Sequence, residues 1–324
     1  MTLIKKSDGI YIDDSIENVL TDVDSIVFDC DGVLIDITES YDLAIIRTTK
    51  YVLTNFAKID DSIDVDFEII DEFKSTGGFN DEVDLTYASI LSIVAAKKTN
   101  QDQRAFISQV VKNTNSTGII SVEKYLETKA DLSEIKNRLS YPGKHGENPL
   151  YQIFDQLFYG PKLYLKLFGV SSKFTEPGLI EHDDVILTES LLKKLQSRFD
   201  EKIGIVTGRG FESVNYSLRN LLKYFNLESS LFLEDESRDL AKPNPKSLIN
   251  CIEKMKCSKT IYVGDSMEDF IMAKKVTAYG RETIFCGIIG TSKDPQKKLK
   301  LFEQNDAHLI LDSINLLPNV LNLE

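Results

Sequence analysis

The first predicted strand is a short apolar run that ends abruptly in acidic residues. The run DSIVFD, residues 24–29, has only apolar residues between Ser25 and Asp29. A strand buried on both faces of a parallel sheet has this composition, because neither face is left for water. Comparable runs, each predicted as a buried strand, are KIGIVTG (202–208), SLFLED (230–235), KTIYVGD (259–265), ETIFCG (282–287) and HLIL (308–311).

Helical patterns separate these runs. Apolar residues recur at intervals of three and four in SLLKKLQSRF (190–199), ESVNYSLRNLLKYF (212–225), PKSLINCIEKM (245–255) and MEDFIMAKKV (267–276). The alternation of strand and helix predicts an α/β fold, a doubly wound parallel sheet with helices on both faces. In such a sheet the ligand site lies beyond the carboxyl ends of the strands.

The stretch from Thr38 to Asp183 has helical patterns but no convincing buried strand. These patterns are SYDLAIIRTTKYVLTNF (40–56), DEVDLTYASILSIVAAKK (81–98), QRAFISQVVKN (103–113) and NPLYQIFDQLF (148–158). We therefore predict a large inserted α-helical domain over residues 38–183 and an α/β core formed by residues 1–37 and 184–324. The loops STGGFNDE (75–82) and YPGKHGEN (141–148) carry the turn residues and polar groups of loops that face a ligand.

Composition narrows the classes of partner. Lys and Arg total 38 against 51 Asp and Glu, and the formal charge of −13 opposes binding to a nucleic acid backbone. The four cysteines show no CxxC spacing and the three histidines are scattered, so no zinc site is expected. No run approaches the roughly 18 apolar residues of a membrane span, and the N-terminus is too acidic for a signal peptide. We expect a cytoplasmic protein with no nucleic acid or membrane partner; the oligomeric state is not readable.

Two carboxylates follow the first predicted strand. Asp29 and Asp31 in DCDG are two residues apart, a spacing that directs both side chains to one side of an extended chain. At about 4 Å and an effective dielectric constant near 20 they repel by roughly 4 kcal/mol, so a positive partner is needed. The hard cation Mg²⁺ suits oxygen ligands at this spacing.

The segment IVTGRG supplies groups suited to an anion. Thr207 offers a hydroxyl, and Gly208 lets the backbone approach an anion closely. A helix beginning near Phe211 is expected to aim free N–H groups at the same place.

Two further segments complete the set. Lys242 in AKPNP precedes a helix that Pro245 can start, and a fixed lysine neutralises charge that opposes attack on a phosphate. In GDSMED, Asp265 follows a buried strand and Asp269 comes four residues later. The two carboxylates share a face if a helix begins between them.

Together these groups fit transfer of a phosphoryl group to a carboxylate. Asp29 would attack phosphorus and form an aspartyl phosphate, while Asp31 would protonate the leaving alcohol and later activate water. Mg²⁺ would be bound by Asp29, Asp265 and the main-chain carbonyl of Asp31. The equatorial phosphate oxygens would be bound by Thr207, Gly208 and Lys242.

DCDGV, the TG of IVTGR, KPNP and GDSMED resemble the four ordered motifs of haloacid dehalogenase superfamily phosphatases. The resemblance implies a Rossmann-like core, a helical cap formed by residues 38–183, and a small phosphorylated metabolite as substrate. It assigns the roles above to Asp29, Asp31, Thr207, Lys242 and Asp265. For Asp269 it implies contact with the metal through water or another ligand. The insertion is larger than most caps of this class, and Arg209 follows the Thr-Gly pair where many members differ.

Other residues have competing explanations. Cys30 beside Asp29 invites a redox role, but a buried small hydrophobe is the simpler interpretation. The acidic run 234–236 has the composition of a solvated loop. Candidates for substrate selection are Phe79, Asn80, Lys144, His145 and Arg209. Loop packing explains the first four equally well.

Four other functions compete with a phosphatase. A phosphomutase would form the same aspartyl phosphate and differ only in excluding water. A nucleotide-binding Rossmann-type protein would use GRGFES, but Ser213 replaces the third glycine of that fingerprint. A glycosyltransferase would leave Lys242 and GDSMED without a role, and a dehalogenase of the same superfamily would not require Mg²⁺.

Overall fold

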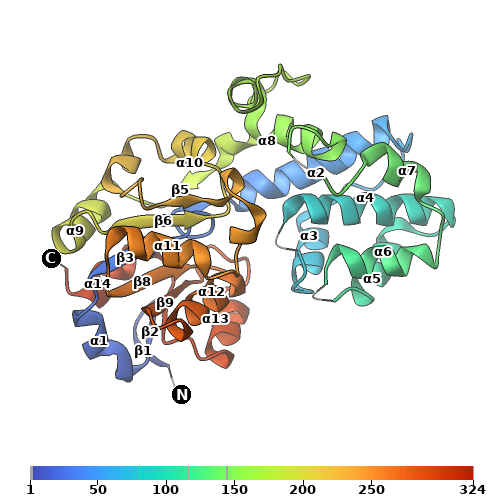
Figure 1. Ribbon diagram of the computed structural model, residues 1–324. Coiled ribbons are helices and arrows are strands. Elements are labelled where there is room, and N and C mark those ends of the chain that lie inside the picture. Colours follow the sequence, from blue (N-terminus) through green and yellow to red (C-terminus); the bar gives the residue numbers. More distant parts are fainter. Residues whose placement is uncertain (1–2, 80, 116, 144, 324) are drawn as a thin grey trace. The chain divides into compact units, whose positions relative to one another are not determined.

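The computed structural model describes residues 3–79, 81–115, 117–143 and 145–323. The chain divides into two compact units, drawn in Figure 1. The core unit comprises Met1–Thr38 and Asp183–Glu324, and the helical unit comprises Glu39–His182.

The core unit is built on one eight-stranded sheet with the strand order β1-β2-β10-β9-β8-β3-β6-β7. The strands from β10 to β7 in this order pair in parallel, whereas β2 is antiparallel to β1 and β10. The strands are β1 (Ile4–Ser7), β2 (Ile10–Ile12), β3 (Ser25–Phe28), β6 (Ile203–Thr207), β7 (Leu231–Phe232), β8 (Lys259–Gly264), β9 (Glu282–Ile288) and β10 (Leu309–Leu311).

Helices cover both faces of this sheet. Successive strand residues point to opposite sides, so each strand contributes apolar side chains to both faces. Ile26 and Phe28 of β3 pack into one buried cluster, and Val27 packs into the other. The first cluster includes residues of α1 (Glu17–Thr21), α9 (Glu189–Phe199), α10 (Phe211–Leu218) and α14 (Leu317–Leu321). The second includes residues of α11 (Lys246–Met255), α12 (Met267–Ala278) and α13 (Pro295–Gln304). The predicted doubly wound α/β fold is confirmed.

Two parts of the sheet differ from the prediction. The ribbon of β1 and β2 was not predicted, because these strands are short and β1 is exposed along its length. The run 230–235 was predicted as a strand, yet only Leu231–Phe232 is one, and Leu233–Asp235 forms a 3-10 turn. This turn brings the carboxylates of Glu234 and Asp235 to the start of α10, where they accept N–H groups.

The helical unit contains no strand among its described residues. Its helices are α2 (Thr38–Asn55), which begins at the last residue of the core segment, α3 (Phe67–Lys74), α4 (Glu82–Lys98), α5 (Gln103–Lys112), α6 (Ile119–Glu127), α7 (Ser133–Leu139) and α8 (Pro149–Phe168). Helix α4 is buried almost all round from Val83 to Ala96, and its alanines and serines let neighbouring helices approach closely. The predicted helical character of this stretch is confirmed.

The chain passes between the units at a short ribbon that belongs to the core unit. β4 (Ile35–Asp36) pairs antiparallel with β5 (Asp184–Val185).

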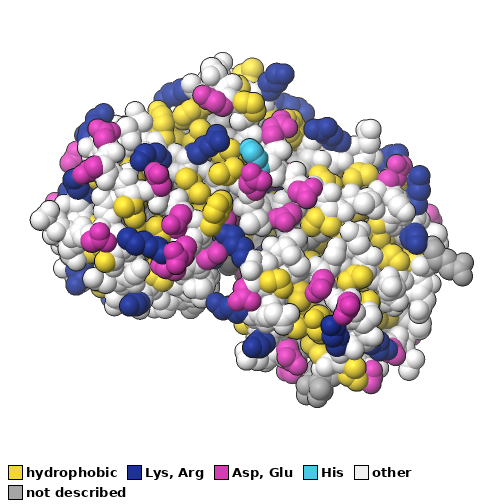
Figure 2. Space-filling view, turned by 180° about the vertical axis from the view of Figure 1, so that it is seen from behind, with side chains coloured by type: hydrophobic (Ala, Val, Ile, Leu, Met, Phe, Trp, Pro, Cys, Tyr) yellow, Lys and Arg dark blue, Asp and Glu magenta, His cyan; other side chains and the backbone are white. Residues whose placement is uncertain are grey.

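None of the described helices is both long and apolar enough to cross a membrane. On the face shown in Figure 2, basic side chains are interspersed with acidic ones.

Arg198 of α9 ties that helix to two others in the core unit. Its guanidinium donates to the carbonyl of Leu321 at 2.8 Å and to that of Leu20 at 2.5 Å. We predict that Arg198→Met, which keeps an apolar stem but removes the donors, lowers the free energy of unfolding by about 1–3 kcal/mol. Urea denaturation followed by circular dichroism measures this value. The control Lys193→Met changes an exposed residue of the same helix, and an equal effect of both variants would contradict the prediction.

Candidate active site

Three central strands deliver their carboxyl ends to one edge of the sheet. Asp29 follows β3, Thr207 ends β6 and Asp265 follows β8. β3 lies between the other two strands and pairs with both in parallel. The N–H of Asp29 donates to the carbonyl of Val263 at 2.8 Å, so the pairing continues to the first site residue. Segments far apart in the sequence therefore place these side chains on one edge.

Lys242 joins two of the carboxylates. Its Nζ lies 2.8 Å from Oδ1 of Asp29 and 2.8 Å from Oδ1 of Asp269. Burial alone would lower the pKa of Lys242, but the charges of Asp269 and Asp29 outweigh it and the pKa is raised. The lysine therefore stays charged at neutral pH.

Asp269 contacts several other residues of the site. Helix α12 begins after Ser266, and Asp269 and Ser266 cap it reciprocally. The Oδ1 of Asp269 also accepts from the hydroxyl of Tyr262 at 2.8 Å, and its Oδ2 accepts from the N–H of Asp265 at 3.2 Å. Burial would raise its pKa, but Lys242 outweighs that effect and the pKa is lowered. Asp269 thus remains a carboxylate that orients Lys242 and the loop carrying Asp265.

Oxygen atoms of Asp29, Asp265 and Asp269 lie within 4.8 Å of one another. Three carboxylates at this spacing repel, and they offer the hard oxygen ligands that a divalent cation prefers. Lys298 of α13 places its Nζ 2.7 Å from Oδ2 of Asp265, which shows that the position attracts positive charge. The donor set therefore fits a divalent cation.

Burial is the main reason that the pKa of Asp29 is raised to about 8. Lys242 opposes this rise, whereas Asp269, Asp265 and Asp31 add to it.

The neighbouring Cys30 is fully buried in the core, and burial raises the pKa of its thiol well above the usual range. Cys30 therefore has the surroundings of an inert small hydrophobe.

Asp31 faces a different partner. Its Oδ1 lies 2.6 Å from Nε of Arg209, and Arg209 Nη1 lies 2.7 Å from Oδ2 of Asp183. Burial, opposed by Arg209 and reinforced by Asp183, raises the pKa of Asp31 to about 6. Its side chain keeps 26% exposure, so a ligand can reach it. Two aspartates separated by one residue thus occupy two distinct environments.

Thr207 and Gly208 lie at the carboxyl end of β6 and directly precede Arg209. Thr207 is fully buried, and its Oγ1 accepts from the N–H of Arg209 at 3.3 Å. Gly208 is exposed, and an added Cβ would meet no other atom within 4 Å. Protein packing therefore does not explain a glycine at this position.

The expectation that α10 aims free N–H groups at an anion is wrong. The N–H groups of Gly210 and Phe211 donate to Oε2 of Glu234 at 2.9 Å and to Oδ2 of Asp235 at 2.6 Å. Two N–H groups at this helix terminus therefore already have carboxylate partners, which disfavours binding of an anion or a dinucleotide to them. The side chains of residues 234–236 are exposed, as expected of a solvated loop, and those of Glu234 and Asp235 also accept these two N–H groups.

The candidates for substrate selection in the helical unit have protein partners or lie outside the described residues. Phe79 is buried against Phe73, with ring centroids 5.2 Å apart. His145 Nδ1 lies 3.0 Å from Asp155 Oδ1. Asn80 and Lys144 lie outside the described residues.

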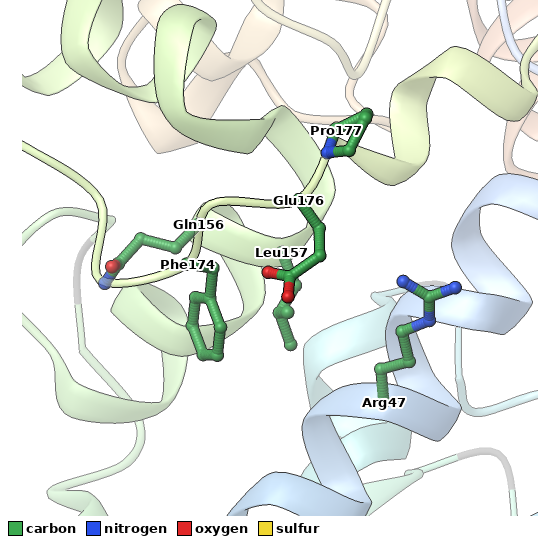
Figure 3. Close-up of a pocket in the computed structure, with 6 residues that line it drawn as sticks. All are labelled: Arg47, Gln156, Leu157, Phe174, Glu176 and Pro177. Carbon is green, nitrogen blue, oxygen red and sulfur yellow. The ribbon is translucent and has the colours of Figure 1, made fainter.

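A cavity of about 250 Å³ lies within the helical unit, with Arg47 and Glu176 among its lining residues (Figure 3). Phe174 also lines it and packs edge-on against Tyr51, with ring centroids 5.1 Å apart. None of the lining residues belongs to the four motif segments.

Three contributors to the site were not predicted. Lys298, Asp183 and Tyr262 contact Asp265, Arg209 and Asp269, respectively. Lys298 and Asp183 stand in segments with no distinguishing pattern, because their roles depend on tertiary contacts. Tyr262 did carry a signal, since the hydroxyl of a tyrosine in a buried strand needs a partner.

Comparison with known proteins gives a family match. A family model described as haloacid dehalogenase-like hydrolase matches residues 109–279, more than half of the chain. The matched range includes Thr207, Lys242, Asp265 and Asp269 but begins after Asp29 and Asp31. No curated protein matches the chain.

Three solved structures are similar to this chain to different degrees. Phosphatase Tt82 from Thermococcus thioreducens is 24% identical with a TM-score of 0.58, over 86% of this chain and 98% of that one. A HAD hydrolase of family IA, variant 3, from Entamoeba histolytica is 13% identical with a TM-score of 0.46, over 92% and 99%. A β-phosphoglucomutase from Clostridium difficile is 13% identical with a TM-score of 0.41, over 93% and 97%. At these identities the first likeness concerns the fold, and the other two carry no argument.

Substitution of Gly32 tests whether the acidic cluster binds a divalent cation. It adopts φ +69°, and a Cβ at this residue would overlap the carboxylate of Asp265. We predict that Gly32→Ala displaces Asp265 and weakens divalent cation binding at least tenfold, as measured by isothermal titration calorimetry.

The matched control is Gly280→Ala in the same unit. Gly280 has φ +86°, but an added Cβ would meet no other atom within 4 Å. Both variants carry the cost of about 1–2 kcal/mol for alanine in a left-handed conformation. Only Gly32→Ala is expected to weaken cation binding, and equal cation affinity in the two variants would refute the predicted displacement.

Proposed function

The chain belongs to the haloacid dehalogenase-like hydrolase family, and from this premise we propose that it is a Mg²⁺-dependent phosphatase with Asp29 as nucleophile. The observation that carries the proposal is the contrast between two neighbouring aspartates. Asp29 contacts Lys242 within the acidic cluster, whereas Asp31 contacts Arg209 outside it. Pairs of carboxyl groups held in different environments are suited to different roles in one reaction.

The first half of the reaction transfers the phosphoryl group to the protein. A carboxylate oxygen of Asp29 attacks phosphorus, and the bond between phosphorus and the ester oxygen breaks. Asp31, whose pKa is raised to about 6, gives its proton to the leaving oxygen. The products of this half are an aspartyl phosphate and a free alcohol.

The second half returns the protein to its starting state. Asp31, now a carboxylate, takes a proton from a water molecule as the water oxygen attacks phosphorus. The bond between phosphorus and the Asp29 oxygen breaks, which restores the carboxylate and releases inorganic phosphate. Asp31 is therefore acid in the first half and base in the second.

Mg²⁺ is the cation that we propose for the acidic cluster, held by Asp29, Asp265 and the main-chain carbonyl of Asp31. When bound, it supplies positive charge that reduces repulsion between the nucleophile and the phosphate oxygens. Asp269 acts through its contacts with Lys242 and the N–H of Asp265. This role is consistent with indirect contact between Asp269 and the metal.

Thr207, Gly208 and Lys242 are the proposed ligands of the equatorial phosphate oxygens. The Thr207 hydroxyl accepts from the N–H of Arg209 and would donate its own proton to phosphate. Gly208 offers an exposed backbone without a side chain. Lys242 holds positive charge on the Asp29 side of the site.

The proposed substrate is a small phosphorylated metabolite. We propose that residues 38–183 act as a cap that encloses it, and we retain the cytoplasm as the proposed location. A screen of phosphorylated metabolites for released phosphate, with Mg²⁺ present, would identify the substrate class. Sugar phosphates, phosphoglycolate and amino-alcohol phosphates belong in that screen.

Replacement of the nucleophile tests the proposal directly. We predict that Asp29→Asn reduces hydrolysis of p-nitrophenyl phosphate at least 10³-fold, because no aspartyl phosphate can form. Phosphate release is measured with Mg²⁺ present, and orthovanadate should inhibit the unmodified enzyme.

The control is Asp24→Asn, which changes a carboxylate that accepts N–H groups of Ser258 and Lys259 away from the proposed chemistry. This variant should lose stability but keep its turnover. Retention of activity by folded Asp29→Asn would overturn the nucleophile assignment.

Cation binding should depend on pH through Asp29. Since its pKa in the cation-free protein is about 8, the carboxyl must lose a proton before it can bind a cation. We predict that Mg²⁺ affinity rises by up to about tenfold per pH unit and levels off above pH 8. Calorimetric titrations between pH 6 and 9 measure this slope. Asp29→Asn should flatten it, and an equally steep slope in that variant would assign the proton to another group.

A further inference from the structure

Arg209 contacts both the proposed acid of the reaction and a second buried carboxylate. We propose that Arg209, anchored by Asp183, is a positioning residue that fixes the carboxyl group of Asp31 toward the leaving oxygen. The inference rests on the proposed function and deepens it. It also replaces the sequence-based expectation that Arg209 selects the substrate.

The guanidinium geometry supports a positioning role. Nε forms an ion pair with Asp31 Oδ1 at 2.6 Å that lacks hydrogen-bond geometry, and Nη1 donates to Asp183 at 2.7 Å, so two different nitrogens of one planar group face carboxylates. The Arg209 side chain is only 2% exposed. A planar, buried fork with two partners has little rotational freedom, so it restricts the orientation of Asp31. Lysine offers one ammonium group and cannot reproduce this fork.

Asp183 is itself held in place. Ser217 of α10 donates from its hydroxyl to Oδ2 of Asp183 at 2.8 Å, and Arg209 Nη1 lies 3.3 Å from the same hydroxyl. The Asp183 side chain is 3% exposed. Asp183 and Ser217 therefore anchor the far end of the guanidinium, while Nε faces Asp31.

The separation of Asp31 from the acidic cluster follows from these contacts. Asp29 and Asp265 pair with Lys242 and Lys298, respectively. Without Arg209, Asp31 would lose the guanidinium group as its positively charged partner. Its carboxylate would then be free to rotate toward the acidic cluster or toward a divalent cation bound there. Such a rotation would remove the proton donor from the leaving oxygen while leaving the nucleophile intact.

A leaving-group series distinguishes positioning from other roles. The phenolate of p-nitrophenyl phosphate leaves without protonation, whereas the more basic phenolate of phenyl phosphate needs an acid. The ratio kcat/KM covers the steps up to release of the phenol, which is where Asp31 acts as an acid. A misplaced Asp31 should therefore penalise phenyl phosphate selectively.

The experiment measures kcat/KM for both esters in Arg209→Met, Arg209→Lys and the unmodified enzyme. In Arg209→Met we expect phenyl phosphate to lose at least tenfold more than p-nitrophenyl phosphate. Arg209→Lys should recover part of the loss, because it restores the charge but not the fork. Arg198→Met, a structural arginine variant of the same unit, should leave the ratio between the two esters unchanged.

Two results would overturn the inference. An equal loss for both esters in Arg209→Met would indicate a general structural role, and a rise in KM alone for both would indicate phosphate binding. If Arg209→Met does not fold, Ser217→Ala carries the same test, because it loosens Asp183 and should shift the ester ratio in the same direction. An unchanged ratio in Ser217→Ala would then refute the anchoring.

The proposed function can fail separately from this inference. If the unmodified enzyme hydrolyses both esters but Asp29→Asn is equally active, the nucleophile assignment fails whatever Arg209 does. If Asp29→Asn is inactive and the ester ratio is unaffected in folded Arg209→Met, only the positioning role fails.

Discussion

Repulsion between carboxylates gathered at one edge of the sheet is the constraint on which the site depends. Asp29, Asp265 and Asp269 have oxygen atoms within 4.8 Å of one another, and such an arrangement is unfavourable unless positive charge is built in. Lys242 and Lys298 provide that charge from two segments far apart in the sequence, one before α11 and one on α13. The surrounding capping box and the Tyr262 hydroxyl hold Asp269 as the fixed partner of Lys242. The remaining negative charge is what makes the cluster suitable for a divalent cation.

The same constraint separates the two aspartates of DCDG. Both arise from one strand end, yet one contacts a lysine inside the cluster and the other an arginine shared with Asp183. Burial raises the pKa of both groups, to about 8 and about 6, but the cations that oppose the rise are different. A cation that binds the cluster would displace the proton of Asp29, whereas Asp31 would still exchange a proton near neutral pH. One short segment thus provides groups suited to attack and to proton transfer.

Much of this arrangement could be predicted because the strands at the site are continuous apolar runs. The runs that became β3, β6 and β8 end at Asp29, Thr207 and Asp265, and parallel pairing alone brings such ends together. Contacts made by side chains from elsewhere were not predictable, because nothing in the local pattern around Lys298 or Asp183 marks them. The helix terminus after Gly210 was misjudged for the same reason, since the carboxylates that satisfy it come from the turn after β7. The role of the helical unit as a cap remains a proposal, because its candidate residues pack within that unit or lie outside the described residues.

The interrupted course of the core unit has a consequence for how the protein is made. β3 pairs with strands that begin at Ile203 and Lys259, so the ribosome synthesises the whole of Glu39–His182 before the first of these partners emerges. Helices of that stretch contact near neighbours in sequence and can collapse while translation continues. Until then the SIVF segment of β3 lacks its partner strands. Its unpaired backbone N–H and C=O groups could pair with another chain, which a chaperone that covers the segment would prevent. Slow elongation through residues 200–265 would prolong this vulnerable period.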